Sequence, residues 1–111
     1  MPRPAAAADV FTAVADPTRR AILDRLRRGD LPVHELAARF DVSRPAVSRH
    51  LRVLRDARLV RERREGRERV YQLTPGPLRD IAAWANAYEQ FWQTRLTNLK
   101  RHLEAQESRH R

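Results

Sequence analysis

Residues 34–54 constrain the fold of this chain more than any other stretch. Their sequence, HELAARFDVSRPAVSRHLRVL, has apolar residues at helical spacing on both sides of Asp41-Val42. We therefore expect one helix over residues 34–40 and a second over residues 44–57, with Ser43 as the N-cap of the second. Two helices joined by so short a turn pack across each other, so the sequence predicts a helix-turn-helix unit.

The second of these helices has one buried side and one outward side. Val47, Leu51 and Leu54 recur at positions i, i+4 and i+7, which places them on a single inward stripe. The remaining residues at the start of this helix are mostly basic or hydroxylic, and they are the candidates for contact with a ligand. These candidates are Ser43, Arg44, Pro45, Ser48, Arg49, His50 and Arg52.

Positive charge is concentrated around this helix. The chain has a formal net charge of +9, and 22 of its 23 basic residues are arginine. Residues 44–69 hold ten of these arginines against four acidic residues, a net charge of +6. A compositional bias of the genome would spread arginine evenly, so the clustering indicates a polyanionic partner.

A basic hairpin is expected directly after the second helix. Residues 59–64 and 68–73 alternate in polarity, and Glu65-Gly66-Arg67 separates them with a glycine that permits a tight turn. The candidate binding residues of this hairpin are Arg61, Arg63, Arg64, Arg67 and Arg69. The alternative is an exposed hairpin whose arginines pair with Glu62, Glu65 and Glu68.

A helix-turn-helix followed by a basic hairpin is the plan of a winged helix-turn-helix, which binds double-stranded DNA. Such a recognition helix enters the major groove, where arginine can bind guanine O6 and N7 together. We expect Arg44, Ser48 and Arg49 to reach base edges, Arg52 to contact a phosphate, and the wing to follow the backbone or the minor groove. The alternative is a surface helix with solvated arginines.

His50 has more than one possible role. It lies beside the buried Leu51 and Leu54, so it can pack at the domain edge, bond to another helix or contact a phosphate. We favour these structural or phosphate roles over a base contact.

The rest of the chain predicts a mainly α fold with about five helices and a long C-terminal helix. We expect helices over residues 5–15 and 17–28, the latter capped by Asp16-Pro17, and an extended piece at Leu31-Pro32-Val33. A last helix is expected over residues 78–106. We interpret residues 1–111 as one domain, with a DNA-binding core at 9–75 and dimerisation helices at 5–15 and 78–106.

The last helix is the reason to expect a homodimer. A helix of about 29 residues would be about 43 Å long, against a radius of gyration of about 13 Å for a domain of about 100 residues. Its overhang would expose an apolar stripe, which a second copy can cover. The expected dimer residues are Phe11, Val14, Ile81, Trp84, Tyr88, Phe91, Trp92, Leu96, Leu99 and Leu103. A dimer predicts an inverted-repeat operator.

Several classes of site are disfavoured. Without cysteine the chain has no disulfide and no thiolate metal site. It has no glycine-rich phosphate loop, no catalytic cluster and no apolar run long enough for a membrane span, so we expect no enzyme, cofactor or membrane, and a cytoplasmic location. His102 and His110 are eight residues apart, an unfamiliar spacing for zinc, and we expect no metal.

Three motifs together resemble the ArsR family of winged helix-turn-helix repressors. They are Asp16-Pro17-Thr18-Arg19-Arg20, the run from Ser43 to Leu54, and Arg64-Glu65-Gly66-Arg67, within a match over residues 9–75. The resemblance implies five helices and a wing, a homodimer, and promoter repression released by an effector, here an unknown small molecule or protein.

The chain also departs from that family's pattern. Leu31-Pro32-Val33-His34 stands where metal-sensing members carry cysteines, and Arg58 stands where a glycine usually follows the recognition helix. The aromatic segment WANAYEQFW resembles the metal-independent branch of the family. Two alternatives to a specific repressor stay open, a non-specific architectural DNA-binding protein and a metal-responsive regulator.

Overall fold

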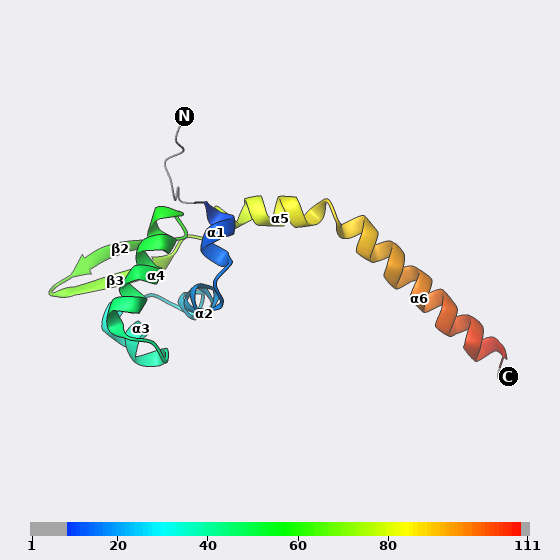
Figure 1. The fold of residues 1–111 in the computed structure, drawn as a ribbon, viewed down its shortest axis with the longest axis horizontal. Coiled ribbons are helices and arrows are strands. Elements are labelled where there is room, and N and C mark those ends of the chain that lie inside the picture. Colours follow the sequence, from blue (N-terminus) through cyan, green and yellow to red (C-terminus); the bar gives the residue numbers. More distant parts are fainter. Residues whose placement is uncertain (1–8, 110–111) are drawn as a thin grey trace, which may run out of the picture. The chain divides into compact units, whose positions relative to one another are not determined.

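The structure, a computed structural model, describes residues 9–109 (Figure 1). These residues form six helices and three strands, which divide into two compact units at Ile81 and Ala82. The expected helix over residues 5–15 is described only from Asp9 on. In chain order the elements are α1 (Val10–Val14), α2 (Pro17–Leu26), β1 (Leu31–Pro32), α3 (Val33–Arg39), α4 (Arg44–Asp56), β2 (Val60–Glu65), β3 (Glu68–Leu73), α5 (Leu78–Asn86) and α6 (Glu89–Arg109).

Side-chain caps begin three of the helices where the sequence places a capping residue. The Asp16 carboxylate accepts the Arg19 backbone N–H at 2.9 Å, and Pro17 occupies the first turn of α2. The Ser43 hydroxyl accepts the Ala46 backbone N–H at 3.2 Å and begins α4, as predicted. Asp9 caps α1 in the same way, through the Phe11 backbone N–H at 2.8 Å. Each cap satisfies a backbone donor that the helix itself leaves unpaired.

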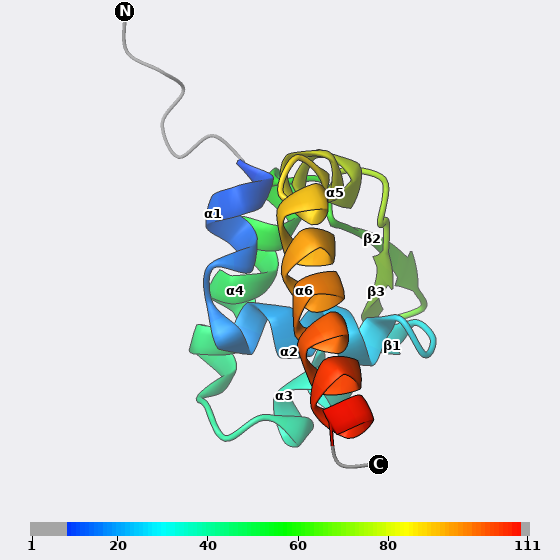
Figure 2. The same cartoon turned by 90° about the vertical axis from the view of Figure 1, so that its right-hand side faces the viewer.

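One apolar core holds the first unit together. Val47, Leu51 and Leu54 of α4 are fully buried, which confirms the predicted inward stripe. They meet Ile22 of α2 and Leu36 of α3 in that core. Figure 2 shows α1 beside α2 and α4, and α1 adds to the same core through its buried apolar side.

The predicted hairpin is present but belongs to a sheet of three antiparallel strands, in the order β1-β3-β2. In the hairpin Glu65 lies opposite Glu68, which leaves Gly66 and Arg67 as the turn. Gly66 has a φ of 62°, a left-handed conformation that glycine adopts without a side-chain clash. The third strand, β1, pairs Leu31 with Tyr71 and thereby fastens the hairpin to the start of α3.

Helix α4 ends in a Schellman motif. The Leu59 N–H donates to the Leu54 carbonyl and the Arg58 N–H donates to the Arg55 carbonyl, both at 2.9 Å. Arg58 occupies the left-handed position of this motif with a φ of 61°, and it is the only residue other than glycine with positive φ between 9 and 109. The strain expected from replacing the family's glycine here is therefore present.

The expectation of one continuous helix over residues 78–106 is wrong. The segment forms two helices, α5 and α6, because the backbone changes its hydrogen bonding at Ala87 and Tyr88. There the Tyr88 N–H donates to the Ala85 carbonyl at 2.9 Å, a three-residue spacing that tightens the end of α5. The 21 residues of α6 still provide the long C-terminal helix of the predicted fold class.

Candidate nucleic-acid interface

The outward side of α4 carries the predicted polar surface. The side chains of Ser43, Arg44, Pro45, Ser48, Arg49 and Arg52 are all exposed. Pro45 occupies the first turn of the helix, where its missing N–H costs no helical hydrogen bond. Helix α4 therefore presents Arg44, Arg49, Arg52 and Ser48 to solvent from one rigid element.

A hollow lies between α4 and the hairpin. Four arginines reach it, Arg44, Arg52 and Arg55 from the helix and Arg69 from β3, and its lining is completed by Val33, Ser48 and Tyr71. Residues 44, 48, 52 and 55 follow each other at helical spacing, so they share the side of α4 that faces the hairpin. Such a concentration of guanidinium groups with a hydroxyl is suited to a phosphate-bearing ligand. Arg49 is not among the lining residues.

A network around Glu62 connects α4 to the hairpin at the edge of this hollow. Arg55 Nη1 lies 3.1 Å from Glu62 Oε1, and the Tyr71 hydroxyl donates to Glu62 Oε2 at 2.8 Å. Burial of the phenol, reinforced by its hydrogen bond to the carboxylate, raises the pKa of Tyr71 to about 12. The network fixes the hairpin against the helix.

The register of the hairpin divides its arginines between two faces. Arg61 and Arg63 share one face, and Arg64 and Arg69 lie directly opposite each other on the other face, together with Tyr71. Arg69 and Tyr71 place that second face at the hollow. Like charges directly opposite each other on neighbouring strands are destabilising, so this face favours an anionic ligand.

Arg63 has carboxylate partners on its own face. Its Nη1 lies 2.7 Å from Asp30 Oδ2, and its Nε lies 2.9 Å from Glu65 Oε1. These two hydrogen bonds that Arg63 donates, the one to Asp30 first, raise the pKa of Arg63. The alternative expected from the sequence, in which arginines of the hairpin pair with its glutamates, therefore holds for Arg63. Between residues 9 and 109, no such ion pair joins Arg61, Arg64, Arg67 or Arg69 to an acidic residue.

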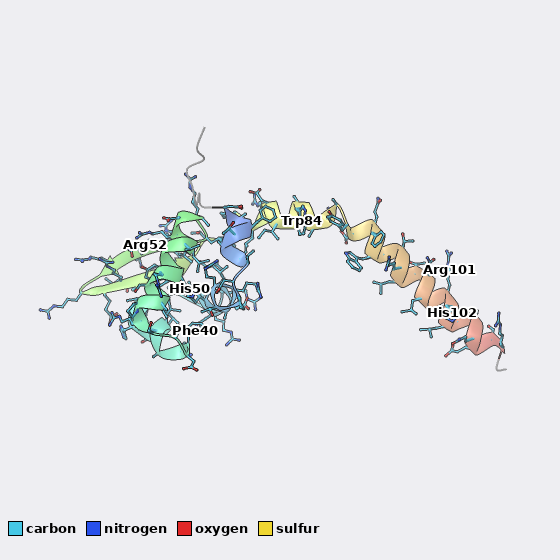
Figure 3. The ribbon with its side chains drawn as sticks, viewed as in Figure 1. Phe40, His50, Arg52, Trp84, Arg101 and His102 are labelled. Carbon is cyan, nitrogen blue, oxygen red and sulfur yellow. The ribbon has the colours of Figure 1, made fainter. Side chains whose placement is uncertain are left out.

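His50 lies on the side of α4 that faces α2, whereas Arg52 reaches the hollow beside the hairpin (Figure 3). The His50 side chain is half-buried, with its Nδ1 3.3 Å from Arg19 Nη1 and 3.9 Å from Asp16 Oδ2. Of the roles that the sequence left open, this position favours a bond to another helix.

The residues predicted for the dimer interface fall into two groups. Val14 and Ile81 pack against the core of the first unit. The others leave much of their apolar surface exposed in the single chain, for example 58% of Trp92 and 60% of Leu96. This exposed group is Phe11, Trp84, Tyr88, Phe91, Trp92, Leu96, Leu99 and Leu103.

On α6 the exposed apolar residues form a regular stripe. Trp92, Leu96, Leu99 and Leu103 follow each other at spacings of four, three and four, the repeat of a helix–helix seam. Phe91 and Trp92 meet edge to face with ring centroids 5.9 Å apart, and the Arg95 guanidinium lies 4.5 Å from the centre of the Phe91 ring. The stripe is therefore flanked by ordered aromatic contacts.

The described residues hold no group of three or more His, Cys, Asp or Glu side chains that could bind a metal ion. His102 Nε2 lies 3.2 Å from Gln106 Nε2, and His110 lies outside the described residues. No helix in the described part of the chain is long and apolar enough to cross a membrane.

Sequence reasoning missed Arg55, Glu62 and Tyr71 as members of this surface. Arg55 follows Arg52 by three residues and so lies on the same side of α4, a signal that was available in the spacing. The position of Glu62 between Arg55 and Tyr71 depends on the hairpin register and on how β2 meets α4, which no local pattern encodes.

The arrangement of α3, a short turn, the exposed helix α4 and a basic hairpin defines a winged helix-turn-helix protein of the DNA-binding, transcription-regulating class. The family model of the bacterial regulatory proteins of the arsR family matches residues 16–62, which run from the cap of α2 into β2.

Two curated relatives and one solved structure support the match. The HTH-type transcriptional regulator Rv2034 of Mycobacterium tuberculosis is 49% identical over 96 residues, which cover 86% of this chain and 87% of that protein. The transcriptional repressor SdpR of Bacillus subtilis is 40% identical over 76 residues, 68% of this chain and 84% of the repressor. An ArsR family transcriptional regulator, RHA00566, matches with a TM-score of 0.68 and 38% identity, covering 77% of this chain and 93% of that structure. This chain belongs to the arsR family of bacterial regulatory proteins.

Proposed function

We propose that this regulator acts in the cytoplasm as a homodimer that binds an inverted-repeat operator and represses transcription. Residues 9–75 supply DNA binding, and α6 supplies the main dimer contact. The proposal includes no catalytic role and no cofactor. The proposal also includes an effector, either a small molecule or a protein, whose binding releases the regulator from DNA.

The observation that carries the DNA-binding part is the continuity of positive charge from α4 to the wing. Arg44, Arg52, Arg55 and Arg69 line one hollow around Ser48. We assign Arg44, Ser48 and Arg49 to base edges in the major groove, where arginine binds guanine with two hydrogen bonds. Arg52 is assigned to a phosphate.

The wing arginines divide into two roles in this proposal. We assign Arg64, Arg67 and Arg69 to the DNA backbone or minor groove, because Arg64 and Arg69 lie on the hairpin face that reaches the hollow and Arg67 lies in the turn of the hairpin. Arg63 instead holds the wing to Asp30 and contributes little to DNA affinity. Arg61 shares the face of Arg63 and belongs with it.

The exposed stripe of α6 supports the homodimer. Trp92, Leu96, Leu99 and Leu103 are each more than half exposed in the single chain. A regular apolar stripe of this kind is unstable in water unless another surface covers it. A second α6 around a two-fold axis is the simplest complementary surface, and it places two recognition helices on one DNA duplex.

A footprint of the purified protein on the DNA upstream of its own gene tests the proposal. The expected result is one protected inverted repeat with half-sites a helical turn apart, or a multiple of a turn, bound about a thousandfold more tightly than random duplex. Equal binding to all fragments, with a steep loss of affinity in salt, would identify a non-specific architectural protein. Repression is then checked with a reporter under that promoter, whose output should fall when the regulator is expressed.

A further inference from the structure

The guanidinium group of Arg19, at the start of α2, contacts both α1 and α4. Arg19 Nε donates to the Ala13 carbonyl at 2.7 Å and Arg19 Nη2 donates to the Thr12 carbonyl at 3.0 Å. Both carbonyls lie near the C-terminal end of α1, and the Thr12 carbonyl also accepts the Ala15 backbone N–H at 3.2 Å. Arg20 Nη1 donates to the next carbonyl, that of Val14, at 2.8 Å. The start of α2 therefore holds the end of α1.

The same guanidinium group reaches the recognition helix. Its third nitrogen, Nη1, lies 3.3 Å from Nδ1 of His50 in the middle of α4. An arginine side chain only donates hydrogen bonds and stays charged, so His50 Nδ1 must be the acceptor. The bond from Arg19 therefore requires the neutral ring with its proton on Nε2.

The charged groups in contact with His50 both come from the start of α2. Arg19 is the donor, and the Asp16 carboxylate lies 3.9 Å from Nδ1. Within the described residues, α1 faces this junction with backbone carbonyls, and no ion pair or hydrogen bond joins His50 to a charged group of α3 or the wing. A proton on Nδ1 would remove the acceptor, oppose Arg19 with a second positive charge and turn the ring toward Asp16.

We infer that His50 is a positioning residue rather than a DNA ligand, and that its bond from Arg19 holds the recognition helix to α1 only while the ring is neutral. His50 directly follows Arg49 in α4. Loss of its bond to Arg19 should therefore shift the part of α4 that we assign to the DNA bases. DNA affinity should then fall in mild acid, through loss of this bond. If His50 instead bound a phosphate, DNA affinity would rise in mild acid, because protonation of the ring would add a positive charge next to DNA.

Two substitutions separate this role from simple packing. The side-chain oxygen of asparagine can take the place of Nδ1 as an acceptor and does not titrate, whereas glutamine reaches further and takes the place of Nε2. His50→Asn should keep the wild-type affinity for the footprinted DNA at pH 7.5, and His50→Gln should lose about tenfold, the worth of one hydrogen bond to a charged group.

The pH profile supplies the readout that packing alone would not change. Between pH 7.5 and 5.5 wild-type affinity should fall by about tenfold and that of His50→Asn should stay level, because only a histidine can take up a proton that removes the acceptor. His34→Asn is the matched control, because His34 is a half-exposed histidine of α3 near Glu68, and it should keep the wild-type profile. Equal profiles for wild type and His50→Asn would overturn the inference.

A second measurement does not depend on DNA. The affinity measurements rest on the proposed function. The ¹⁵N chemical shifts of the His50 ring do not, because they report the tautomer of the ring in the free protein. The expected result is a proton on Nε2 at pH 7.5 that becomes a mixture of tautomers in Arg19→Gln. A wild-type ring with its proton on Nδ1 would refute the inference even if no operator were found. Absence of any footprint with the expected tautomer would instead refute the proposed function alone.

Discussion

At the scale of single residues, Arg58 holds the backbone in a strained conformation just after the end of α4. Arg58 adopts a φ of 61° in the Schellman motif that ends α4, a position that glycine fills at lower conformational cost. Its neighbours in the motif, Leu54 and Leu59, are fully buried and leave the backbone little freedom to relax. The strain therefore persists in the folded state.

Replacing Arg58 with glycine should stabilise the protein. The left-handed backbone costs an arginine about 1 kcal/mol or more, and part of this gain is offset by the greater freedom of glycine in the unfolded chain. We expect the free energy of unfolding to rise by about 0.5–1 kcal/mol in denaturant titrations. Arg58→Ala is the control, since it removes the side chain but keeps the strain, and it should give no such gain. A glycine variant less stable than the alanine variant would refute this account.

The Tyr71 phenol predicts a stability change in alkali. A free tyrosine titrates at about pH 10, whereas the folded protein raises the pKa of Tyr71 to about 12. The folded state favours the neutral phenol, so its contribution is complete below the unfolded pKa and is lost as the pH rises through the folded pKa. From about pH 9.5 to 11.5, the free energy of unfolding should fall more steeply in wild type than in Tyr71→Phe. Identical slopes for wild type and Tyr71→Phe would contradict the prediction.

At the scale of the elements, the helix-turn-helix was predictable because its signals are local. Ser43 and Asp16 cap their helices, and the stripe of Val47, Leu51 and Leu54 has the period of a helix. The hairpin was equally predictable, since alternation and Gly66 mark its strands and turn.

Other features of the elements depend on contacts that no local pattern contains. Strand β1 has only two residues and exists through its pairing with β3, about forty positions further along the chain. The break between α5 and α6 has no glycine or proline at Ala87 and Tyr88, and the apolar spacing continues across it. The partners of Arg63 and His50, Asp30 and Arg19, are 33 and 31 positions away.

The two faces of the wing should differ in their effect on DNA binding. Arg69 reaches the hollow beside α4, and Arg63 is held by Asp30. We expect Arg69→Ala to weaken binding to all duplexes and to reduce the slope of log affinity against log salt by about 1, as one phosphate contact is lost. Arg63→Ala should leave that slope unchanged. A larger change of slope in the Arg63 variant would reverse the assignment of the faces.

At the scale of the whole molecule, the proposed function depends on a second copy of the chain. The part of the predicted apolar stripe that lies on α6 is exposed in the single chain, although this helix is shorter than expected. Trp92 starts the part of the stripe on α6 and is 58% exposed. Because the side chain is not in the core of the single chain, its substitution should affect assembly more than folding.

Trp92→Arg should convert the dimer into a monomer. A charge within a helix–helix seam loses its hydration when the seam forms, which opposes association. Sedimentation velocity should give a single species near 13 kDa for the variant. Gln93→Arg adds the same charge one position away from the stripe and should stay dimeric. If both variants sediment as dimers, α6 is not the seam.

The central claim, that the outward face of α4 reads DNA bases, is tested most directly by Arg49. The measurement compares the affinities of wild type and Arg49→Ala for the footprinted operator and for a scrambled duplex of equal length. If Arg49 contacts a base, the variant loses about 1–3 kcal/mol on the operator and almost nothing on the scrambled duplex. Equal losses on both duplexes would contradict the claim, because they would reduce Arg49 to a contact with the phosphate backbone.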